Sequence, residues 1–447
     1  MELTKDVIEM WRNIIEKKDK KRLLAELTPL HPADIAELFD ELDLDEILYL
    51  YSHLDNERAG DVLMELDEEN RHKLLKRLPS EFIAHRFVDN LNTDDAVDLI
   101  QELDKDTQAD VLKYIKNVDQ AGDIADLLRY DEDTAGGLMG TEMIVVNENW
   151  SMPQCVEETR KQGEKVAYLY YIYVIDDDER LVGVLPVKKL ITSPSVYKIK
   201  NIMKCDPIAV KEEDTVETVT EIIDKYDLVA LPVIDTIGRL VGQITVDDVV
   251  DEMREQHERD YQLASGISQD VETSDTVVQQ TTARLPWLII GILGGVGTSA
   301  LLGLFTGTMT ENPAMAIFIP LIAGTGGNVG IQSSAIVVQG LANNSLKPNN
   351  MWSQIMKETF VALINASILS LLVYTYNFFM LGNMILTAAV SFSLFAVVMF
   401  ASVFGTIVPI VLQRLHIDPA LATGPFITIT DDMVGMLIYM YIVTALL

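Results

Sequence analysis

Residues 420–435 have the sequence Ala-Leu-Ala-Thr-Gly-Pro-Phe-Ile-Thr-Ile-Thr-Asp-Asp-Met-Val-Gly, and this stretch decides the fold of the C-terminal half. It lies in an apolar run, 421–447, that is long enough to cross a bilayer as a helix. Two adjacent carboxylates, Asp431 and Asp432, lie inside that run, and no Lys, Arg or His follows them. A charge at mid-membrane costs about 2.5–3.5 kcal/mol on insertion scales, so an acid there indicates a functional site. Because no local base neutralises the pair, we expect it to attract a cation.

Four further apolar runs precede this one, and together they predict five membrane spans. The runs cover 285–306, 313–342, 358–381, 384–413 and 420–447. The basic residues that flank them, Arg284, Lys347, Lys357 and Arg414, all fall on one side of the predicted membrane. Loops rich in Lys and Arg stay in the cytoplasm. We therefore expect a multi-pass protein of the cell membrane, with its N-terminus in the cytoplasm and its C-terminus outside.

Glycine and proline residues predict breaks in three of these spans. The second span contains the segment Gly324–Gly330 (Gly-Thr-Gly-Gly-Asn-Val-Gly), the fourth contains Pro409, and the fifth contains Gly424-Pro425. Irregular backbone at membrane depth is tolerated where it lines a water-filled cavity, and broken helices with polar side chains build ion sites. The alternative is that the glycines only allow close packing of helices.

Helical geometry separates the two adjacent acids of the fifth span. Asp431 and Asp432 lie about 100° apart around a helix, so both cannot face one axis equally. Thr428 and Gly435 lie on the Asp432 side, which is the small and polar face, and we predict that Asp432 lines a pore. Five spans are few for a pathway within one chain. Since two-fold dimers are the commonest oligomers, we expect a homodimer with one Asp432 from each subunit at the axis.

The acidic charge of the chain is concentrated before the membrane region. The net charge is −33, and the first 284 residues alone hold 63 acids against 32 bases. Such a surface argues against nucleic acid or anionic lipid surfaces as a partner but permits binding of divalent cations. Many of these acids are also expected to lie on solvated helix faces. The two cysteines, Cys155 and Cys205, lack metal-ligand spacing and are typical of reduced cytosolic thiols.

The periodicity of the acidic half indicates two domains and a linker. Residues 1–132 repeat short amphipathic segments, such as the face formed by Ala96, Leu99, Ile100 and Leu103, and predict an all-α superhelical domain. Residues 133–248 contain a duplicated strand-turn-strand-helix unit. Its Tyr-Val-Ile-Asp (173–176) and Leu-Val-Gly-Val (181–184) recur 59 residues later as Pro-Val-Ile-Asp (232–235) and Leu-Val-Gly-Gln (240–243). Residues 249–283 predict a charged connecting helix and linker, and 284–447 the transmembrane domain.

The duplicated unit resembles a tandem of cystathionine-β-synthase (CBS) motifs, which implies an α/β CBS-pair domain and a pair that can bind an adenine nucleotide. The whole chain resembles the MgtE family of magnesium channels. The motifs that carry this resemblance are Asp-Thr-Ala-Gly-Gly-Leu-Met (133–139), Gly-Thr-Gly-Gly-Asn (324–328) with Gln-Ser (332–333), Asp-Pro-Ala (418–420), and Asp-Met-Val-Gly (432–435). The expected fold is therefore a multidomain membrane protein: an all-α superhelical domain, the CBS pair, and five transmembrane helices.

The resemblance assigns roles to particular acids. It implies magnesium at Asp432 in the pore and at Asp418 in the cytoplasmic mouth. We further expect backbone oxygens near Gly424 and the side chains of Asn328 and Thr428 to line the pore and orient the waters of the ion. The regulatory magnesium sites implied by the family fall on Asp94, Asp95, Asp98, Asp214, Asp227, Asp247, Asp248, Asp251, Glu255 and Glu258. Asp431 departs from the family pattern, which usually has a small hydroxyl residue there.

These features predict passive, inward flow of magnesium driven by the membrane potential. Magnesium retains its water shell and binds through one or two carboxylates. High cytosolic magnesium is expected to bridge the acidic clusters and close the pore. The sequence lacks a phosphate-binding loop with a following Lys-Ser/Thr, so nothing indicates a pump or another enzyme. Manganese or cobalt remains the alternative substrate. A membrane-anchored nucleotide sensor without transport is a further alternative. An intramembrane enzyme is a third alternative, but the sequence does not contain the cluster of ligand residues that it would need.

Overall fold

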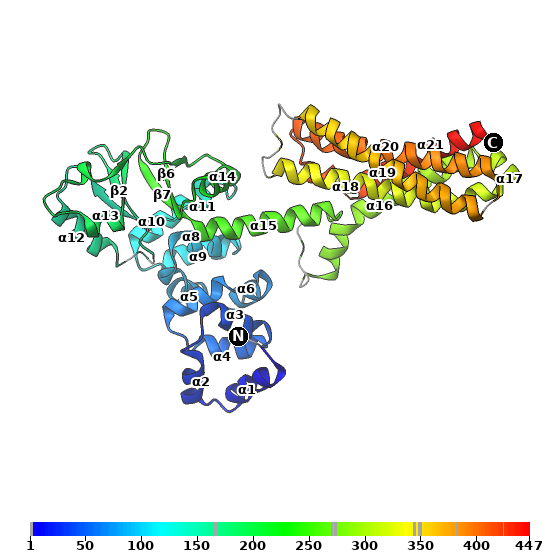
Figure 1. The fold of residues 1–447 in the computed structure, drawn as a ribbon. Coiled ribbons are helices and arrows are strands. Elements are labelled where there is room, and N and C mark those ends of the chain that lie inside the picture. The colour runs from blue at the N-terminus through cyan, green and yellow to red at the C-terminus, as the bar shows by residue number, and fades with distance from the viewer. Residues whose placement is uncertain are drawn as a thin grey trace. The chain divides into compact units, whose positions relative to one another are not determined.

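The computed structural model describes residues 3–164, 166, 168–269, 271, 275–342, 346, 351–380, 382–422 and 424–447. Lys347 and Thr423 lie outside these ranges. The chain divides into two compact units, Met1–Arg254 and Glu255–Leu447, which are described separately (Figure 1).

The first unit begins with a series of short helices (Figure 1). They are α1 (Lys5–Glu16), α2 (Lys20–Leu27), α3 (Pro32–Asp40), α4 (Leu44–Tyr51), α5 (Asn56–Met64), α6 (Glu68–Leu75), α7 (Ser80–Arg86), the 3-10 turn η1 (Val88–Asn90), α8 (Thr93–Gln101), α9 (Lys105–Tyr114) and α10 (Val118–Leu127). Aspartates start many of them. The side chains of Asp19, Asp43, Asp55, Asp67 and Asp104 each accept a backbone N–H in the first turn of the following helix. Some of the acidic residues therefore serve as N-caps, and each cap stabilises its helix by about 1 kcal/mol.

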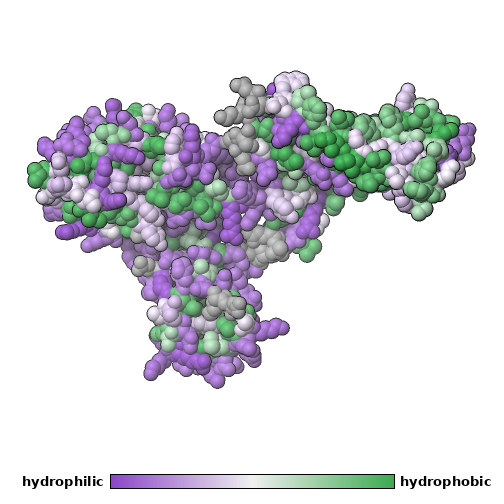
Figure 2. Space-filling model, in the orientation of Figure 1, coloured by the Kyte–Doolittle hydropathy of each residue, from purple (hydrophilic) through white to green (hydrophobic). Residues whose placement is uncertain are grey.

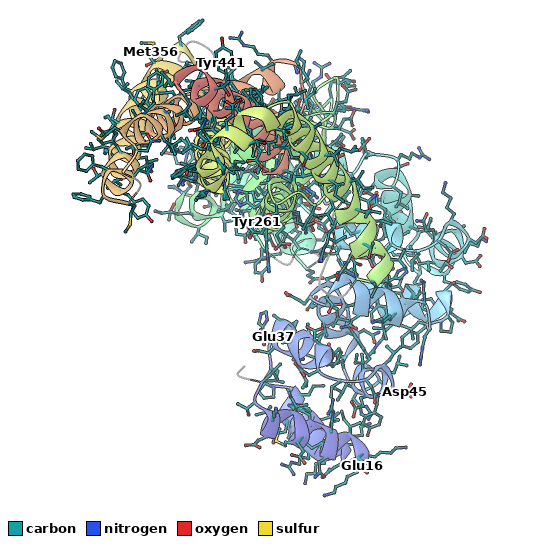
Figure 3. All side chains as sticks on the ribbon, turned by 90° about the vertical axis from the view of Figure 1, so that its right-hand side faces the viewer. Glu16, Glu37, Asp45, Tyr261, Met356 and Tyr441 are labelled. Atoms are coloured by element: carbon teal, nitrogen blue, oxygen red, sulfur yellow. The ribbon has the colours of Figure 1, made fainter. Side chains whose placement is uncertain are left out.

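The apolar faces of these helices form one core. Trp11, Leu23 and Phe39 are fully buried there, while acids such as Glu16 and Asp45 lie on the outer surface (Figure 3). The same core continues into the following domain through Val219. The predicted all-α domain is confirmed.

The CBS-type region contains two small sheets. Its elements are α11 (Ala135–Leu138), β1 (Ile144–Asn147), α12 (Met152–Gln162), β2 (Tyr171–Ile175), β3 (Leu181–Pro186), α13 (Val187–Thr192), η2 (Ile199–Asn201), β4 (Lys204–Cys205), β5 (Val210–Lys211), α14 (Val216–Tyr226), β6 (Ala230–Ile234) and β7 (Leu240–Thr245). One sheet has the order β1-β2-β3-β4 and the other β5-β6-β7.

The duplication is visible in the strand register. In each sheet a parallel pair, β1-β2 or β5-β6, is followed by an antiparallel hairpin, β2-β3 or β6-β7. A register shift falls between Val174 and Ile175 in one repeat and between Val233 and Ile234 in the other. The predicted repeat is confirmed. Helix α15 (Val246–Ala264) starts directly after β7 and runs without a break past residue 249, so the helix that ends the second repeat and the predicted connecting helix are one element.

The second unit contains the five predicted spans. Its elements after α15 are α16 (Val277–Gly303), α17 (Thr306–Glu311), η3 (Pro313–Phe318), α18 (Ile319–Ala342), α19 (Met351–Met380), α20 (Met384–Arg414), η5 (Pro419–Ala422) and α21 (Pro425–Leu446). Helices α18, α20 and α21 pack against one another, α19 packs on α20, and α16 packs on α21. Large apolar side chains remain exposed on this unit, such as Ile292 and Leu371, and give it a hydrophobic surface suited to lipid (Figure 2).

Two of the predicted breaks are wrong. Helix α18 runs continuously through the glycines at 324–330, and α20 runs continuously through Pro409. The glycines instead allow close packing: a Cβ added at Gly326 would lie 3.0 Å from Val397 Cγ1 on α20. An unbroken helix satisfies its backbone groups internally, which lipid requires. The third predicted break is confirmed, because α21 begins at Pro425 after Gly424, whose φ is +61°.

Candidate cation site

The two adjacent acids of α21 have different surroundings. Asp431 is 1% exposed, and neither of its carboxylate oxygens has a hydrogen-bond partner among the described residues. It packs against Gly330 of α18, where an added Cβ would collide with the Asp431 carboxylate. Asp432 lies on a partly exposed face of the same helix. The chain thus encloses the first acid and leaves the second one partly exposed.

The predicted pore-lining residues lie at different positions relative to Asp432. A Cβ added at Gly327 would lie 3.9 Å from Asp432 Oδ1 and 3.4 Å from Thr428 Cγ2, so α18 and α21 meet closely there. The Thr428 hydroxyl donates to the Gly424 carbonyl at 3.0 Å within its own helix. Asn328 is exposed on the next position of α18. The structure therefore brings Thr428 and the Gly327 backbone to Asp432, and places Asn328 beside this contact.

A second acidic pair lies at the start of the last span. Asp418 is exposed in the turn after α20 and accepts the Ala420 backbone N–H at 2.8 Å. Asp260 of α15 lies near it: burial, and then the charge of Asp418, raise the pKa of the Asp260 carboxyl. Asp260 was not among the predicted site residues. Its place among several acids of one charged helix gave no signal that distinguished it.

The end of α15 contacts the start of α21. A Cβ added at Gly424 would collide with the Ala264 carbonyl oxygen, and one added at Gly266 would lie 2.6 Å from Pro425 Cγ. Both glycines have a positive φ, which permits this close approach of the two backbones. The end of α15 and the first turn of the Asp432 helix are therefore in direct contact.

Six predicted regulatory acids gather in the first unit, where α8 faces the start of α15. They are Asp94, Asp95 and Asp98 of α8, and Asp247, Asp248 and Asp251 of α15. The Asp248 carboxylate is fixed by the Thr245 hydroxyl at 2.7 Å. Asp94 packs against the backbone of Gly140, where an added Cβ would lie 2.8 Å from its Oδ2. The fold thus brings together acids about 150 residues apart in the sequence.

Crowding of these acids disfavours their ionised forms. Burial, and then the charge of Asp248, raise the pKa of Asp94 well above its usual range. The same two causes raise the pKa of Asp95 from 3.8 to about 7. Asp98 is exposed at the edge of the group, and partial desolvation by the neighbouring protein and the charge of Asp248 raise its pKa from 3.8 to about 6. The pKa of Asp248 is also raised, with burial as the main cause. A cation that binds near these groups would relieve their mutual repulsion.

The remaining predicted regulatory acids lie elsewhere. Asp214 accepts the Lys211 backbone N–H at 2.7 Å in the turn before α14, and Asp227 is the exposed C-cap of that helix. Glu255 and Glu258 are exposed on α15, and Glu255 pairs with Arg259 at 3.5 Å. In the part of the chain that the structure describes, no three His, Cys, Asp or Glu side chains converge closely enough to hold a metal ion. The described residues of one chain therefore present acids without a complete coordination shell.

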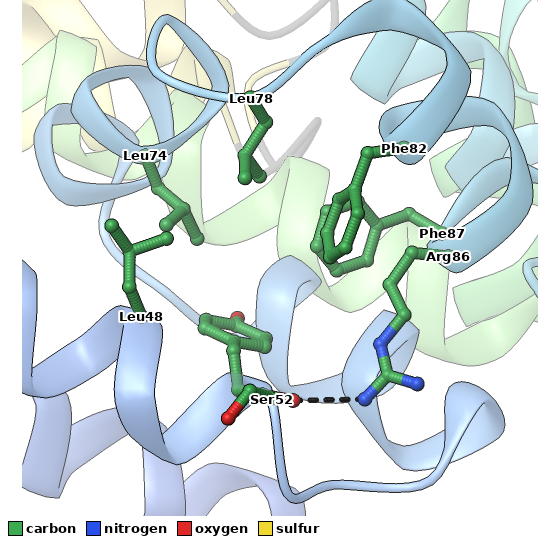
Figure 4. Close-up of a pocket in the computed structure, with 8 residues that line it drawn as sticks. Leu48, Ser52, Leu74, Leu78, Phe82, Arg86 and Phe87 are labelled. Atoms are coloured by element: carbon green, nitrogen blue, oxygen red, sulfur yellow. Dashed lines mark hydrogen bonds between the residues drawn. The ribbon is translucent and has the colours of Figure 1, made fainter.

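A cavity of about 380 Å³ in the helical domain is unrelated to these acids (Figure 4). Its lining is mostly apolar: Leu48, Tyr51, Ser52, Leu74, Leu78, Phe82, Arg86 and Phe87. The Arg86 guanidinium donates to the Tyr51 carbonyl at 2.8 Å, so it binds backbone of its own domain. This cavity offers no acidic oxygen to a cation.

The fold and these sites define a multi-pass membrane protein with an intramembrane acid and an acidic, CBS-containing N-terminal region. Comparisons with known proteins support this class of protein. Family models match as "Divalent cation transporter" at 319–442, "MgtE intracellular N domain" at 30–133, and "CBS domain" at 135–195 and 199–255.

Curated relatives match nearly the whole chain. "Magnesium transporter MgtE" of Thermus thermophilus is 32% identical over 97% of both chains, and that of Enterococcus faecalis is 30% identical over 92% of this chain and 90% of the relative. A crystal structure titled as the cytosolic domain of the Mg²⁺ channel MgtE in complex with ATP matches with a TM-score of 0.52 and 30% identity. It covers 55% of this chain and 99% of its own. The soluble part of a magnesium transporter matches with a TM-score of 0.51 and 28% identity over 56% of this chain and 97% of its own. The chain belongs to the MgtE family of magnesium transporters.

Proposed function

We propose that this protein conducts Mg²⁺ passively into the cell through a pore between two copies of the chain. The observation that carries the proposal is the asymmetry of the acidic pair. Asp431 is enclosed within the protomer, whereas Asp432 stays partly exposed on a spanning helix, next to a glycine-lined face of α18. A dimer that covers this face would place two Asp432 carboxylates around one axis. Two carboxylates and retained waters are the usual way in which proteins bind magnesium.

The gate follows from the acidic clusters. With little cytosolic magnesium, ionised acids of α8 and α15 repel one another. With abundant magnesium, ions bind between them and favour the arrangement in which α8 and α15 are close, which is a shift by differential binding. The contact of Ala264 and Gly266 with Gly424-Pro425 passes this change to α21. Asp418 with Asp260 supplies a further acidic pair at the mouth, on the side we assign to the cytoplasm.

An adenine nucleotide at the CBS pair is part of the same proposal. Its support is the relative whose cytosolic domain was crystallised with ATP. We place the N-terminus in the cytoplasm and the C-terminus outside, because the bases Arg284, Lys357 and Arg414 all lie on one side of the spans.

The pore proposal is tested by substitution of Asp432 in the full chain, reconstituted in proteoliposomes with a fluorescent magnesium indicator. Asp432→Ala should abolish potential-driven Mg²⁺ entry, because the intramembrane carboxylate that attracts the hydrated ion is gone. Thr430→Ala is the matched control, since its hydroxyl only bonds the Phe426 carbonyl of its own helix at 2.9 Å. Normal Mg²⁺ entry through the Asp432→Ala variant would refute the proposal. Competition with Mn²⁺, Co²⁺ and Ca²⁺ in the same vesicles determines the ion preference.

The gate is tested by patch-clamp recording with controlled cytosolic magnesium. The double variant Asp247→Ala, Asp251→Ala removes two charges that surround Asp248. It should need more cytosolic Mg²⁺ for closure than the wild type. Unchanged inhibition would show that these acids do not form the sensor.

A further inference from the structure

A cluster of buried polar side chains links the three helices α18, α19 and α20. It is separate from the site at Asp432. The Ser333 hydroxyl on α18 donates to Glu358 Oε1 on α19 at 2.8 Å, and the Ser402 hydroxyl on α20 lies 3.2 Å from the same oxygen. The two hydroxyls are 2.9 Å apart. Glu358, Ser333 and Ser402 are 7%, 3% and 1% exposed. A carboxyl group inside a span is costly, so its presence calls for a role.

These serines differ from most other described serines in the spans, although Ser370 of α19 also bonds between helices, to the Ser391 carbonyl of α20. Ser393 of α20 is also buried, but its hydroxyl donates to the Ala389 carbonyl of its own helix at 2.7 Å. Ser367 of α19 does the same with Leu363. Ser333 and Ser402 instead bond between helices and converge on one carboxylate oxygen. Such bonds hold membrane helices together where lipid gives no hydrophobic driving force.

The cluster lies on the face of α18 that leads to the candidate ion site. Gly327, Gly330 and Ser333 follow one another at intervals of three residues, so they share one side of the helix. Gly330 is in close contact with Gly405 of α20, and Gly405 is three residues beyond Ser402. About one turn before Gly330 on α18, Gly327 approaches Asp432. A fixed contact at Ser333 therefore sets the position of the α18 segment opposite the acid.

We propose that Glu358 is a positioning residue for ion selection. It holds α18 against α19 and α20 through Ser333 and Ser402, and so fixes the distance between the Gly327 backbone and the Asp432 carboxylate. The inference rests on the proposed magnesium pathway. Glu358 touches neither the ion nor Asp432 and acts only through α18. Recognition of a hydrated ion depends on the spacing of the groups that bind its waters, so a looser α18 would discriminate less between ions of different size.

The acceptor oxygen, rather than the charge, carries this role. Glu358→Gln retains an Oε1 that can accept from both serines, and it should therefore behave like the wild type. Glu358→Ala removes the acceptor from both bonds. Ser333→Ala and Ser402→Ala each remove one bond at smaller cost to packing, and they report on the cluster even if Glu358→Ala does not fold. Ser393→Ala and Ser367→Ala are matched controls.

The experiment compares Mg²⁺ and Ca²⁺ influx into proteoliposomes that contain the full-length variants. The ratio of the two influxes should fall about tenfold in Glu358→Ala, since two interhelical bonds are lost, and by less in the serine variants. It should stay within about twofold of the wild type in Glu358→Gln and in both controls. The thermal midpoint of each purified variant identifies those that fail to fold.

The outcomes separate the inference from the proposed function. Absence of Mg²⁺ influx in the wild type would overturn the proposed function itself. Wild-type influx together with an unchanged ratio in Glu358→Ala, or in both serine variants, would overturn the positioning role alone. A Glu358→Gln variant that loses discrimination as Glu358→Ala does would also overturn it, because the charge and not the acceptor would then be required.

Discussion

Neutralisation of Asp95 should stabilise the contact between α8 and α15, although it removes a predicted magnesium-sensing acid. Burial and the charges of Asp248 and Asp98 raise the pKa of Asp95 from 3.8 to about 7 in the folded protein. At about 1.4 kcal/mol for each pKa unit, the ionised side chain destabilises this region by roughly 4 kcal/mol. Asp95→Asn keeps the shape of the side chain and removes the charge.

The sign of the pH dependence follows from the raised pKa. The stabilising contribution of protonated Asp95 is fully present below its unfolded pKa of about 4, and it is lost as the pH rises through about 7. The wild-type contact should therefore weaken between these values. Asp95→Asn lacks this dependence, so its advantage over the wild type should be largest near pH 8.

Hydrogen exchange of the full-length protein measures the local stability of the contact between α8 and α15, because amide protection reports the free energy of opening for each segment. At pH 8 without magnesium, amides of Thr93–Gln101 should exchange at least about tenfold more slowly in Asp95→Asn than in the wild type. Added Mg²⁺ should slow exchange in the wild type more than in the variant. Asp119→Asn, at an exposed position of α10, is the control. Equal exchange in Asp95→Asn and the wild type would refute the reasoning.

Three further predictions concern stability. Gly330→Ala should lower the thermal midpoint by the equivalent of about 1–3 kcal/mol, since its Cβ would lie 2.6 Å from Ile427 Cγ2 and collide with Asp431, whereas Gly295→Ala, with open space at its Cβ, should not. Tyr439→Phe should cost about 1 kcal/mol by removing the 2.7 Å bond to the Met315 carbonyl, and exposed Tyr441→Phe should be neutral in the same melting assay. Trp11→Ala should cost about 3–5 kcal/mol in the helical domain, measured by exchange of α1 and α4, and the exposed Trp352→Ala much less. Equal effects of a variant and its control would contradict the assigned contact.

Several features of the fold could be predicted because they depend on local composition. Five apolar runs gave five spans, since a helix needs about 20 apolar residues to cross the hydrocarbon core. The 59-residue repeat gave the paired strands, because equal patterns form equal hairpins. The break predicted at 324–330 is wrong, because α18 is continuous there. Several glycines in a span are compatible both with a broken helix and with a continuous helix that packs closely against its neighbours. Only the contacts with Val397, Gly405 and Asp431 show that the second case applies.

The candidate site shows the same division. The sequence by itself determined that two adjacent acids lie in a membrane span and about 100° apart around it. The tertiary structure decided which one is enclosed, because Gly330 leaves room for the Asp431 side chain and α18 leaves Asp432 partly exposed. It also decided which acids of the first unit meet: α8 and α15 are distant in sequence and adjacent in the fold. Hydropathy and helical periodicity are properties of neighbouring residues, whereas the contacts around a carboxylate depend on how separate helices pack.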